Sequence, residues 1–162
     1  MSTAILNRVL EETSEAAATA EVSSQRHLAV MGATIAIRAT MADTEGNLSL
    51  IELSVPPHFP GAPRHYHERM PESFFIIEGS IEVLKGEKWS TCKAGEFVHI
   101  APGTIHAYRN ASAHPARFLI IAPDHDRFFV ELIEWMKREP VWPPKDRAEL
   151  VDFGRRHDTM YL

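Results

Sequence analysis

The chain has 162 residues but only one cysteine, Cys92, so no disulfide can form within it. A single thiol fits a reducing compartment. A chain of this length buries about 70% of the surface that it exposes when unfolded. We therefore expect one domain that needs neither a disulfide nor a structural metal in order to fold.

Long hydrophobic runs are also missing. No apolar stretch reaches the roughly 18 residues that a transmembrane helix requires. The first residues carry Glu11, Glu12 and Glu15 where a signal peptide would be apolar. We therefore expect a cytoplasmic protein with no membrane partner.

Positive charge is scarce, because the net charge is −5 with neutral histidines and no basic cluster occurs. Phosphate binding needs a cationic face, so the composition argues against nucleic acid as a partner. It leaves small-molecule substrates open. By contrast, nine histidines and eleven prolines are on the high side. The prolines indicate many strand ends and turns, and the histidines are candidate ligands.

Helical periodicity is absent from the middle of the chain. Short runs rich in β-branched and aromatic residues occur there instead, separated by glycine, proline and asparagine. The runs are HLAVMGATIAIRAT, LSLIELSV, ESFFIIE, SIEVLK, KWSTC, EFVHIA, HAYRN and ARFLIIA. This pattern predicts an all-β antiparallel sandwich or barrel and argues against a parallel α/β fold.

The two ends of the chain do show helical spacing. Residues 3–20 repeat apolar side chains at intervals of three and four. After Pro123 we expect a helix whose N-cap is Asp124 or Asp126. A second short helix is expected over 146–156. We predict a helical extension over 1–26, the barrel over 27–123, and a helical segment packed on the barrel over 124–162, all within one domain.

His65 and His67 stand next to a predicted strand, together with Glu72. Residues two apart in a strand share a face, so the two imidazoles project together. Glu72 is out of phase with them, but a bend at Met70–Pro71 can reset the alternation. Glu72 then begins the next strand and faces the interior. The sequence thus predicts that these three side chains converge from two adjacent segments.

A third histidine should come from another strand. His106 follows the tight turn Ala101-Pro102-Gly103 and shares a face with Tyr108. At this point the chain resembles the cupin superfamily, whose motifs are G-x5-H-x-H-x3,4-E-x6-G and G-x5-P-x-G-x2-H-x3-N. The chain reads His65-x-His67-x4-Glu72-x6-Gly79, and then Gly95 followed by Gly103-x2-His106-x3-Asn110.

The resemblance covers roughly residues 27–138. Over this range the chain is similar to single-domain cupins of the quercetin 2,3-dioxygenase-like group. It implies a small double-stranded β-helix, or jelly-roll, barrel. Two positions depart from the motifs. Phe59 stands where the first glycine would fall, with Gly61 nearby, and Ala101 stands where the second motif has proline, with Pro102 one residue late.

The resemblance further implies that His65, His67, Glu72 and His106 bind one divalent transition metal, and a homodimer is expected. Imidazoles with one carboxylate suit Fe, Mn, Ni, Co or Zn, and the sequence does not choose among them. In quercetinase-like cupins the corresponding glutamate is thought to act as a base on the substrate hydroxyl, so Glu72 is the candidate catalytic residue, with a role as a metal ligand only as the alternative. Phe74 and Tyr108 share the face of the ligands and are candidate substrate-binding residues.

Three functions remain open on these residues. The first is a dioxygenase that acts on a phenolic or enol substrate. The second is a non-oxidative isomerase, cyclase or lyase at the same metal, and the third is a small-molecule binding protein without turnover.

Phe128 and Phe129 are expected to pack within the helix, or else to form a lid. The remaining histidines have no partners at ligand spacing; we expect a structural role for His99 and surface or loop positions for His27, His58, His114, His125 and His157.

Overall fold

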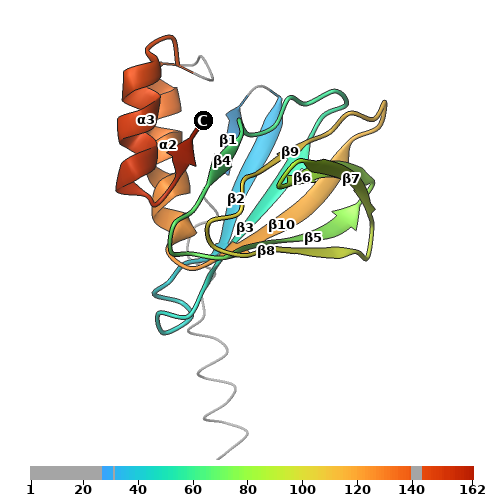
Figure 1. Ribbon diagram of the computed structural model, residues 1–162, viewed down its shortest axis with the longest axis horizontal. Helices are drawn as coiled ribbons and strands as arrows, with labels where there is room; N and C mark the ends of the chain where they lie inside the picture. The colour runs from blue at the N-terminus through green and yellow to red at the C-terminus, as the bar shows by residue number, and fades with distance from the viewer. Residues whose placement is uncertain (1–26, 31, 140–143) are drawn as a thin grey trace, which may run out of the picture.

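The computed structural model describes residues 27–30, 32–139 and 144–162. The helix expected over residues 3–20 lies outside this part. Two antiparallel sheets face each other (Figure 1). The first contains, in spatial order, β1 (His27–Val30), β2 (Ala33–Ala39), β3 (Ser49–Val55), β10 (Ala116–Ala122), β5 (Glu72–Glu78) and β8 (Phe97–Ile100). The second contains β11 (Met160–Tyr161), β4 (His65–Tyr66), β9 (His106–Arg109), β6 (Ser80–Lys85) and β7 (Lys88–Lys93). The predicted all-β barrel of cupin type is confirmed.

Alternation of side chains builds the core between the sheets. In β3 and β10 every second residue is buried, as the sequence pattern predicts for strands with one face inward. The side chains that are almost inaccessible to solvent include Ile51, Leu53, Phe74, Phe118 and Ile120. Burying each such side chain contributes about 1.5–3 kcal/mol to folding. This packing fixes the strand register from which the polar residues project.

The helix α2 (His125–Arg138) follows β10 directly, close to its predicted start. Asp124 is its N-cap residue, but it has a left-handed backbone conformation and its side chain makes no capping bond. Ser49 of β3 caps the helix instead, since its Oγ accepts hydrogen bonds from the backbone N–H groups of His125 and Asp126, both at 3.1 Å. Neither predicted aspartate therefore caps the helix through its side chain.

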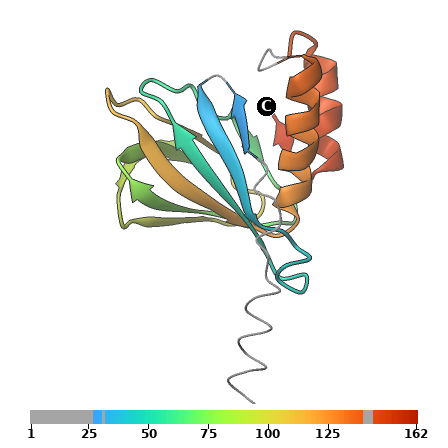
Figure 2. The ribbon, with the colours of Figure 1, turned by 180° about the vertical axis from the view of Figure 1, so that it is seen from behind.

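A second helix, α3 (Arg147–Arg156), is capped by Asp146, whose side chain accepts from the Ala148 N–H at 2.8 Å. The helix α2 contacts β2 and β3, whereas α3 contacts β11. The two helices lie side by side at one side of the barrel, and the C-terminus lies between them and the strands (Figures 1 and 2).

The strand β11 was not expected from the sequence. It pairs with β4, so that Tyr161 lies opposite His65. Gly154 of α3 permits this path, because a Cβ at this position would lie 2.3 Å from the carbonyl oxygen of Thr159. The end of the chain is thus fitted closely between α3 and the strand that carries His65.

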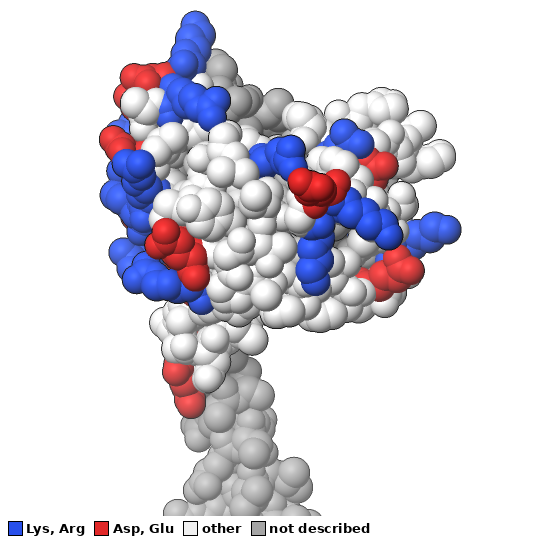
Figure 3. Space-filling model, viewed as in Figure 1, with Lys and Arg blue, Asp and Glu red and all other residues white. Residues whose placement is uncertain are grey.

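On the face shown in Figure 3, Lys and Arg side chains stand among Asp and Glu side chains. Among residues 27–30, 32–139 and 144–162, no helix is long and apolar enough to cross a membrane.

Candidate metal centre

The four candidate ligands meet between the two sheets. One donor atom from each of His65, His67, Glu72 and His106 lies within 4.8 Å of the others, and all four residues are buried. His65 belongs to β4 and His106 to the neighbouring β9, where the two residues are directly paired. Glu72 is the first residue of β5 in the opposite sheet. The cluster therefore bridges the sheets, as the predicted convergence requires.

The change of phase expected at Met70–Pro71 is present. Residues 67–71 leave the ladder after β4, and the chain re-enters a sheet at Glu72. The burial pattern of β5 then places Glu72 on the inner face with Phe74 and Ile76. The irregular segment thus lets a carboxylate five residues after His67 point at the same centre.

Each of the three imidazoles is held by a hydrogen bond from its Nδ1–H to a backbone carbonyl. The pairs are His65 with Pro63 at 2.7 Å, His67 with Asp158 at 2.8 Å, and His106 with Thr104 at 2.9 Å. A carbonyl oxygen can only accept, so Nδ1 carries the proton in each ring. In the neutral rings Nε2 then has a free lone pair. This is the arrangement by which proteins orient histidines as metal ligands.

The Nε2 atoms of His67 and His106 face the Glu72 carboxylate, and this arrangement shows whether the cluster suits a cation. The Nε2 of His106 lies 2.8 Å from Oε2 of Glu72, and that of His67 lies 3.8 Å from the same oxygen. The His67 Nε2 is buried and has no hydrogen-bond partner among the described residues. Lone pairs that face a carboxylate at these distances repel it unless positive charge lies between them. The donor set therefore fits a divalent transition metal.

Burial and neighbouring groups shift the pKa values of three residues of the cluster, His65, His67 and Glu72. Burial and the adjacent His106 lower the pKa of His65 to about 3, so this ring is neutral near pH 7. Burial alone would raise the pKa of Glu72, but the neighbouring His106 and His125 rings hold it well below its ordinary value. Burial opposes a charge on His67, yet the nearby Glu72 carboxylate raises its pKa. The centre thus contains an ionised carboxylate in a low-dielectric setting.

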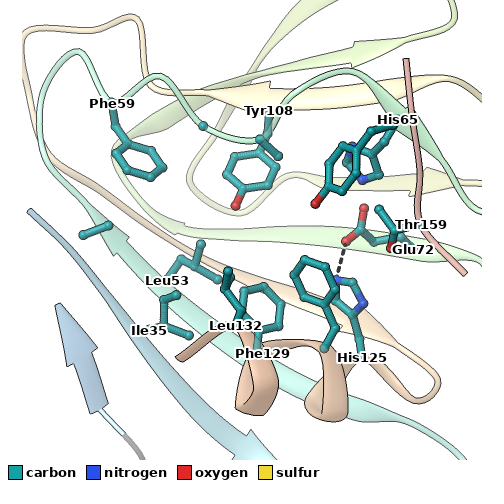
Figure 4. A pocket seen from close by; sticks show the side chains of 15 residues that line it. Ile35, Leu53, Phe59, His65, Glu72, Tyr108, His125, Phe129, Leu132 and Thr159 are labelled. Carbon is teal, nitrogen blue, oxygen red and sulfur yellow. Dashed lines mark ion pairs between the residues drawn. The ribbon is translucent and has the colours of Figure 1, made fainter. Parts of the chain in front are cut away.

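A cavity of about 60 Å³ opens beside the cluster (Figure 4). One water molecule needs roughly 10–15 Å³ on the same measure, so the space holds several water-sized groups. Its polar end is formed by His65, Glu72, His125, Thr159 and the tyrosines Tyr108 and Tyr161. The rest is apolar: Ala33, Ile35, Leu53, Phe59, Gly61, Ala62, Phe128, Phe129 and Leu132. An apolar pocket with convergent polar groups at one end is the usual form of a small-molecule site.

The two candidate substrate-binding residues occupy different places. Tyr108 lines the cavity, and its hydroxyl points into it (Figure 4). Burial raises the pKa of Tyr108, so the phenol stays protonated. Phe74 is not among the lining residues; its ring packs beside Tyr108, at 5.7 Å between centroids, and against Phe118. Phe74 thus supports the wall from behind.

The paired phenylalanines of α2 combine both expected roles. Phe128 and Phe129 are buried and pack edge to face with centroids 5.2 Å apart. Both also line the cavity. The helix therefore closes the cavity on the side opposite Tyr108 (Figure 4).

The expectation that His125 is a surface or loop residue was wrong. It is buried at the first turn of α2, and its Nε2 lies 3.4 Å from Oε1 of Glu72. Its ring stacks on Phe128 at 5.0 Å with an angle of 8°. The sequence did contain a signal, because His125 precedes Phe128, Phe129 and Leu132 at the spacing of one helical face.

The other histidines divide between the interior and the surface. His157 lies in the turn after α3, in keeping with its expected surface or loop position, and its Nε2 contacts Glu131 at 3.1 Å. His99 contacts the hydroxyl of Ser73 at 3.0 Å, in keeping with a structural role. His58 and His114 are exposed. Neither lines the cavity.

The departures from the first motif have a structural reason. Phe59, in place of a glycine, is buried and lines the cavity (Figure 4). Gly61, two residues later, has φ +74° and contacts β9 so closely that a Cβ would lie 1.6 Å from the carbonyl oxygen of Tyr108. The close approach thus occurs at Gly61, and Phe59 is free to supply an aromatic wall.

Comparison with known proteins agrees with this geometry. Residues 51–122 match the family model of the cupin domain. Quercetin 2,3-dioxygenase of Bacillus subtilis (strain 168) is 26% identical over 87 residues, which cover 54% of this chain and 26% of the relative. An uncharacterized protein of Aquifex aeolicus (strain VF5) is 35% identical over 63 residues, which cover 38% of this chain and 51% of the relative. The chain thus aligns with about a quarter and about half of the lengths of these two relatives.

Among solved structures, the polyketide cyclase RemF from Streptomyces resistomycificus superposes with a TM-score of 0.52. The sequences are 22% identical, and the match covers 64% of this chain and 76% of RemF. At this identity the likeness concerns the fold. The matched family model, the two facing antiparallel sheets and the two motifs with their convergent histidines and glutamate lead to one conclusion: residues 51–122 match the cupin domain, and the chain has the cupin fold.

Proposed function

We propose that this cupin is a metal-dependent enzyme that acts on a small phenolic or enol substrate by a reaction of the dioxygenase type. The observation that carries the proposal is the convergence of three Nε2 lone pairs and one carboxylate at the end of an apolar cavity. The partial similarity to a quercetin 2,3-dioxygenase supports the choice of substrate class.

His65, His67, Glu72 and His106 would hold one divalent ion of Fe, Mn, Ni, Co or Zn. Such an ion supplies a Lewis acid and open positions for exogenous ligands. The apolar walls exclude water from the cavity, which strengthens the electrostatic interactions within it. Tyr108 and Tyr161 line the same space, and burial raises the pKa of both phenols. They are therefore hydrogen-bond donors toward an oxygen atom of the substrate.

Glu72 is the candidate base of this site. It is ionised, lines the cavity, and has one carboxylate oxygen turned away from the histidine cluster toward His125. A phenolic or enolic hydroxyl at the polar end of the cavity would be within reach of this oxygen. Proton transfer to a positioned carboxylate requires this proximity before it requires a suitable pKa.

The two phenols also favour a second candidate, a non-oxidative isomerase, cyclase or lyase. Neutral donors opposite an ionised carboxylate are suited to moving a proton across an enolate. The two reactions differ in their need for dioxygen. Turnover that persists in an anaerobic chamber would identify the second reaction, and ligand binding without turnover would identify a binding protein.

The test begins with metal analysis of the purified chain, followed by loading with each of the five metals. We expect one equivalent of metal per chain, and loss of binding in His65→Ala. Oxygen uptake is then measured with flavonols and simpler enols on the loaded protein. Absence of stoichiometric binding after loading would refute the metal site. Stoichiometric binding with no oxygen uptake for any metal would refute only the dioxygenase reaction.

We propose that the chain acts in the cytoplasm; the single thiol supports this location.

We also propose that the chain forms a homodimer. Phe75 and Phe97 are paired on β5 and on the edge strand β8, and their side chains are 37% and 58% exposed. Adjacent exposed aromatic rings on a sheet edge are typical of an interface. Light scattering should give twice the monomer mass for the wild type and the monomer mass for Phe97→Glu. A monomeric wild type would exclude this dimer.

A further inference from the structure

The two oxygen atoms of the Glu72 carboxylate face different partners. Oε2 faces the histidine cluster, at 2.8 Å from Nε2 of His106 and 3.8 Å from Nε2 of His67. Oε1 faces away from the cluster, and Nε2 of His125 lies 3.4 Å from it (Figure 4). His125 comes from the helix after the barrel and belongs to neither cupin motif.

The position of His125 is fixed on several sides. Its backbone N–H donates to Oγ of Ser49, and this hydroxyl donates to the carbonyl of Ala122 at 2.7 Å. The first turn of α2 is therefore tied to β3 and β10. The ring stacks on Phe128 and meets Phe129 edge to face, with centroids 5.0 Å apart in both pairs. The imidazole has little freedom to turn away from Glu72.

The surroundings of the ring also indicate where its proton lies. Nδ1 of His125 is buried with no hydrogen-bond partner among the described residues. A ring proton on Nε2 meets an acceptor, Oε1 of Glu72, whereas a proton on Nδ1 would be unsatisfied. His125 therefore has the opposite tautomer from His65, His67 and His106, whose protons are on Nδ1. It is a hydrogen-bond donor to the carboxylate, not a fourth imidazole ligand.

We propose that His125 is a positioning residue that holds Oε1 of Glu72 away from the metal, so that Glu72 is a ligand through Oε2 alone. This inference rests on the proposed metal site and assigns separate roles to the two oxygens. Oε2 completes the donor set, while Oε1 stays oriented at the cavity as the atom available to a substrate hydroxyl. Without the Nε2–H donor, the carboxylate can rotate and bind through both oxygens.

The test compares two substitutions at one position. In His125→Gln the side-chain amide N–H₂ stands the same number of bonds from Cα as Nε2 and keeps the donor. In His125→Phe a ring of similar size keeps the packing on Phe128 but removes the donor. Co(II) binding is measured by isothermal titration calorimetry, and the visible spectrum of the bound Co(II) reports its coordination.

We expect His125→Phe to weaken Co(II) binding by about 10- to 100-fold, the usual effect of losing a partner of a ligand. Its visible spectrum should change with the altered carboxylate coordination. His125→Gln should bind within about threefold of the wild type and restore the wild-type spectrum. A role in packing alone would leave the spectrum of both variants unchanged.

Two results would overturn the inference: wild-type affinity and spectrum in His125→Phe, or a tenfold loss of affinity in a folded His125→Gln. The second result is decisive even if His125→Phe does not fold. His65→Ala, measured in parallel, separates this inference from the metal site itself. If the wild type binds no Co(II), the proposed function fails and the inference fails with it. If the wild type binds and His65→Ala does not, the comparison at His125 decides the inference alone.

Discussion

Asp158, close to the C-terminus, holds the segment that carries His67. Its carboxylate accepts hydrogen bonds from the backbone N–H groups of Glu68, Arg69 and Met70 at 3.2, 2.9 and 3.0 Å. Its own carbonyl accepts from Nδ1 of His67 at 2.8 Å. Replacing Asp158 with alanine removes both side-chain acceptor oxygens, and with them three hydrogen bonds, but leaves the carbonyl. We expect this change to destabilise the fold and to loosen the position of His67.

The loss in free energy of unfolding follows from these hydrogen bonds. A hydrogen bond to a charged group contributes about 1.5–3 kcal/mol net. The three donors lie in a turn that water can partly reach after the change, so the loss is smaller than three times this value. The ion pair with Arg69 adds nothing measurable, because that arginine side chain is 84% exposed. We expect Asp158→Ala to lower the free energy of unfolding by about 2–4 kcal/mol.

Urea denaturation of the metal-free protein measures this loss. Asp158→Asn keeps one acceptor oxygen and should lose about half as much. Asp152→Ala is the matched control, since Asp152 is an exposed aspartate on α3 whose side chain is 71% exposed; it should change stability by less than about 0.5 kcal/mol. If Asp158→Ala is as stable as this control, the carboxylate does not hold the turn and the reasoning is wrong.

Two further changes test the fold away from the metal. Gly61→Ala should cost about 3 kcal/mol or more by urea denaturation, because the new Cβ would lie 1.6 Å from the carbonyl oxygen of Tyr108 and φ is +74°; an unchanged midpoint would contradict the close approach. Glu52 bonds Arg38 at 3.0 Å and Arg117 at 3.4 Å, and although burial opposes its ionisation, these arginines lower its pKa below 4.5. Glu52→Gln should therefore lower stability above about pH 5, and the difference from the wild type should vanish as the pH falls below 4.5; a difference that is constant down to pH 3 would refute the assignment.

The barrel could be predicted from the sequence because its strands are short and regularly patterned. The segment LSLIELSV alternates apolar and polar residues, and β3 buries every second residue as that pattern requires. His65, His67 and Glu72 could be predicted to converge from strand alternation and the bend at Met70–Pro71, and the resemblance to the cupin motifs added His106 to them. Both inferences depend on local order along the chain, which a single sequence contains.

The features that could not be predicted from the sequence depend on contacts between residues far apart in the chain. The strand β11 has only two residues and no periodicity of its own, and it forms because β4 offers it an edge. Ser49 and His125 are 76 residues apart, and Asp158 and His67 are 91 apart, so no local pattern connects them. His125 has the spacing of one helical face with Phe128, Phe129 and Leu132, but this spacing does not show that the face lies against Glu72.

About half of the residues that line the cavity lie outside the segment that matches the cupin model. The cupin match ends at residue 122, and it contains all four candidate ligands. Phe128, Phe129 and Leu132 of α2, and Thr159 and Tyr161 at the C-terminus, follow it and line the cavity. The match to the family model therefore does not extend to these walls. The matched segment thus supplies the four candidate ligands, whereas part of the size and polarity of the cavity depends on residues after β10.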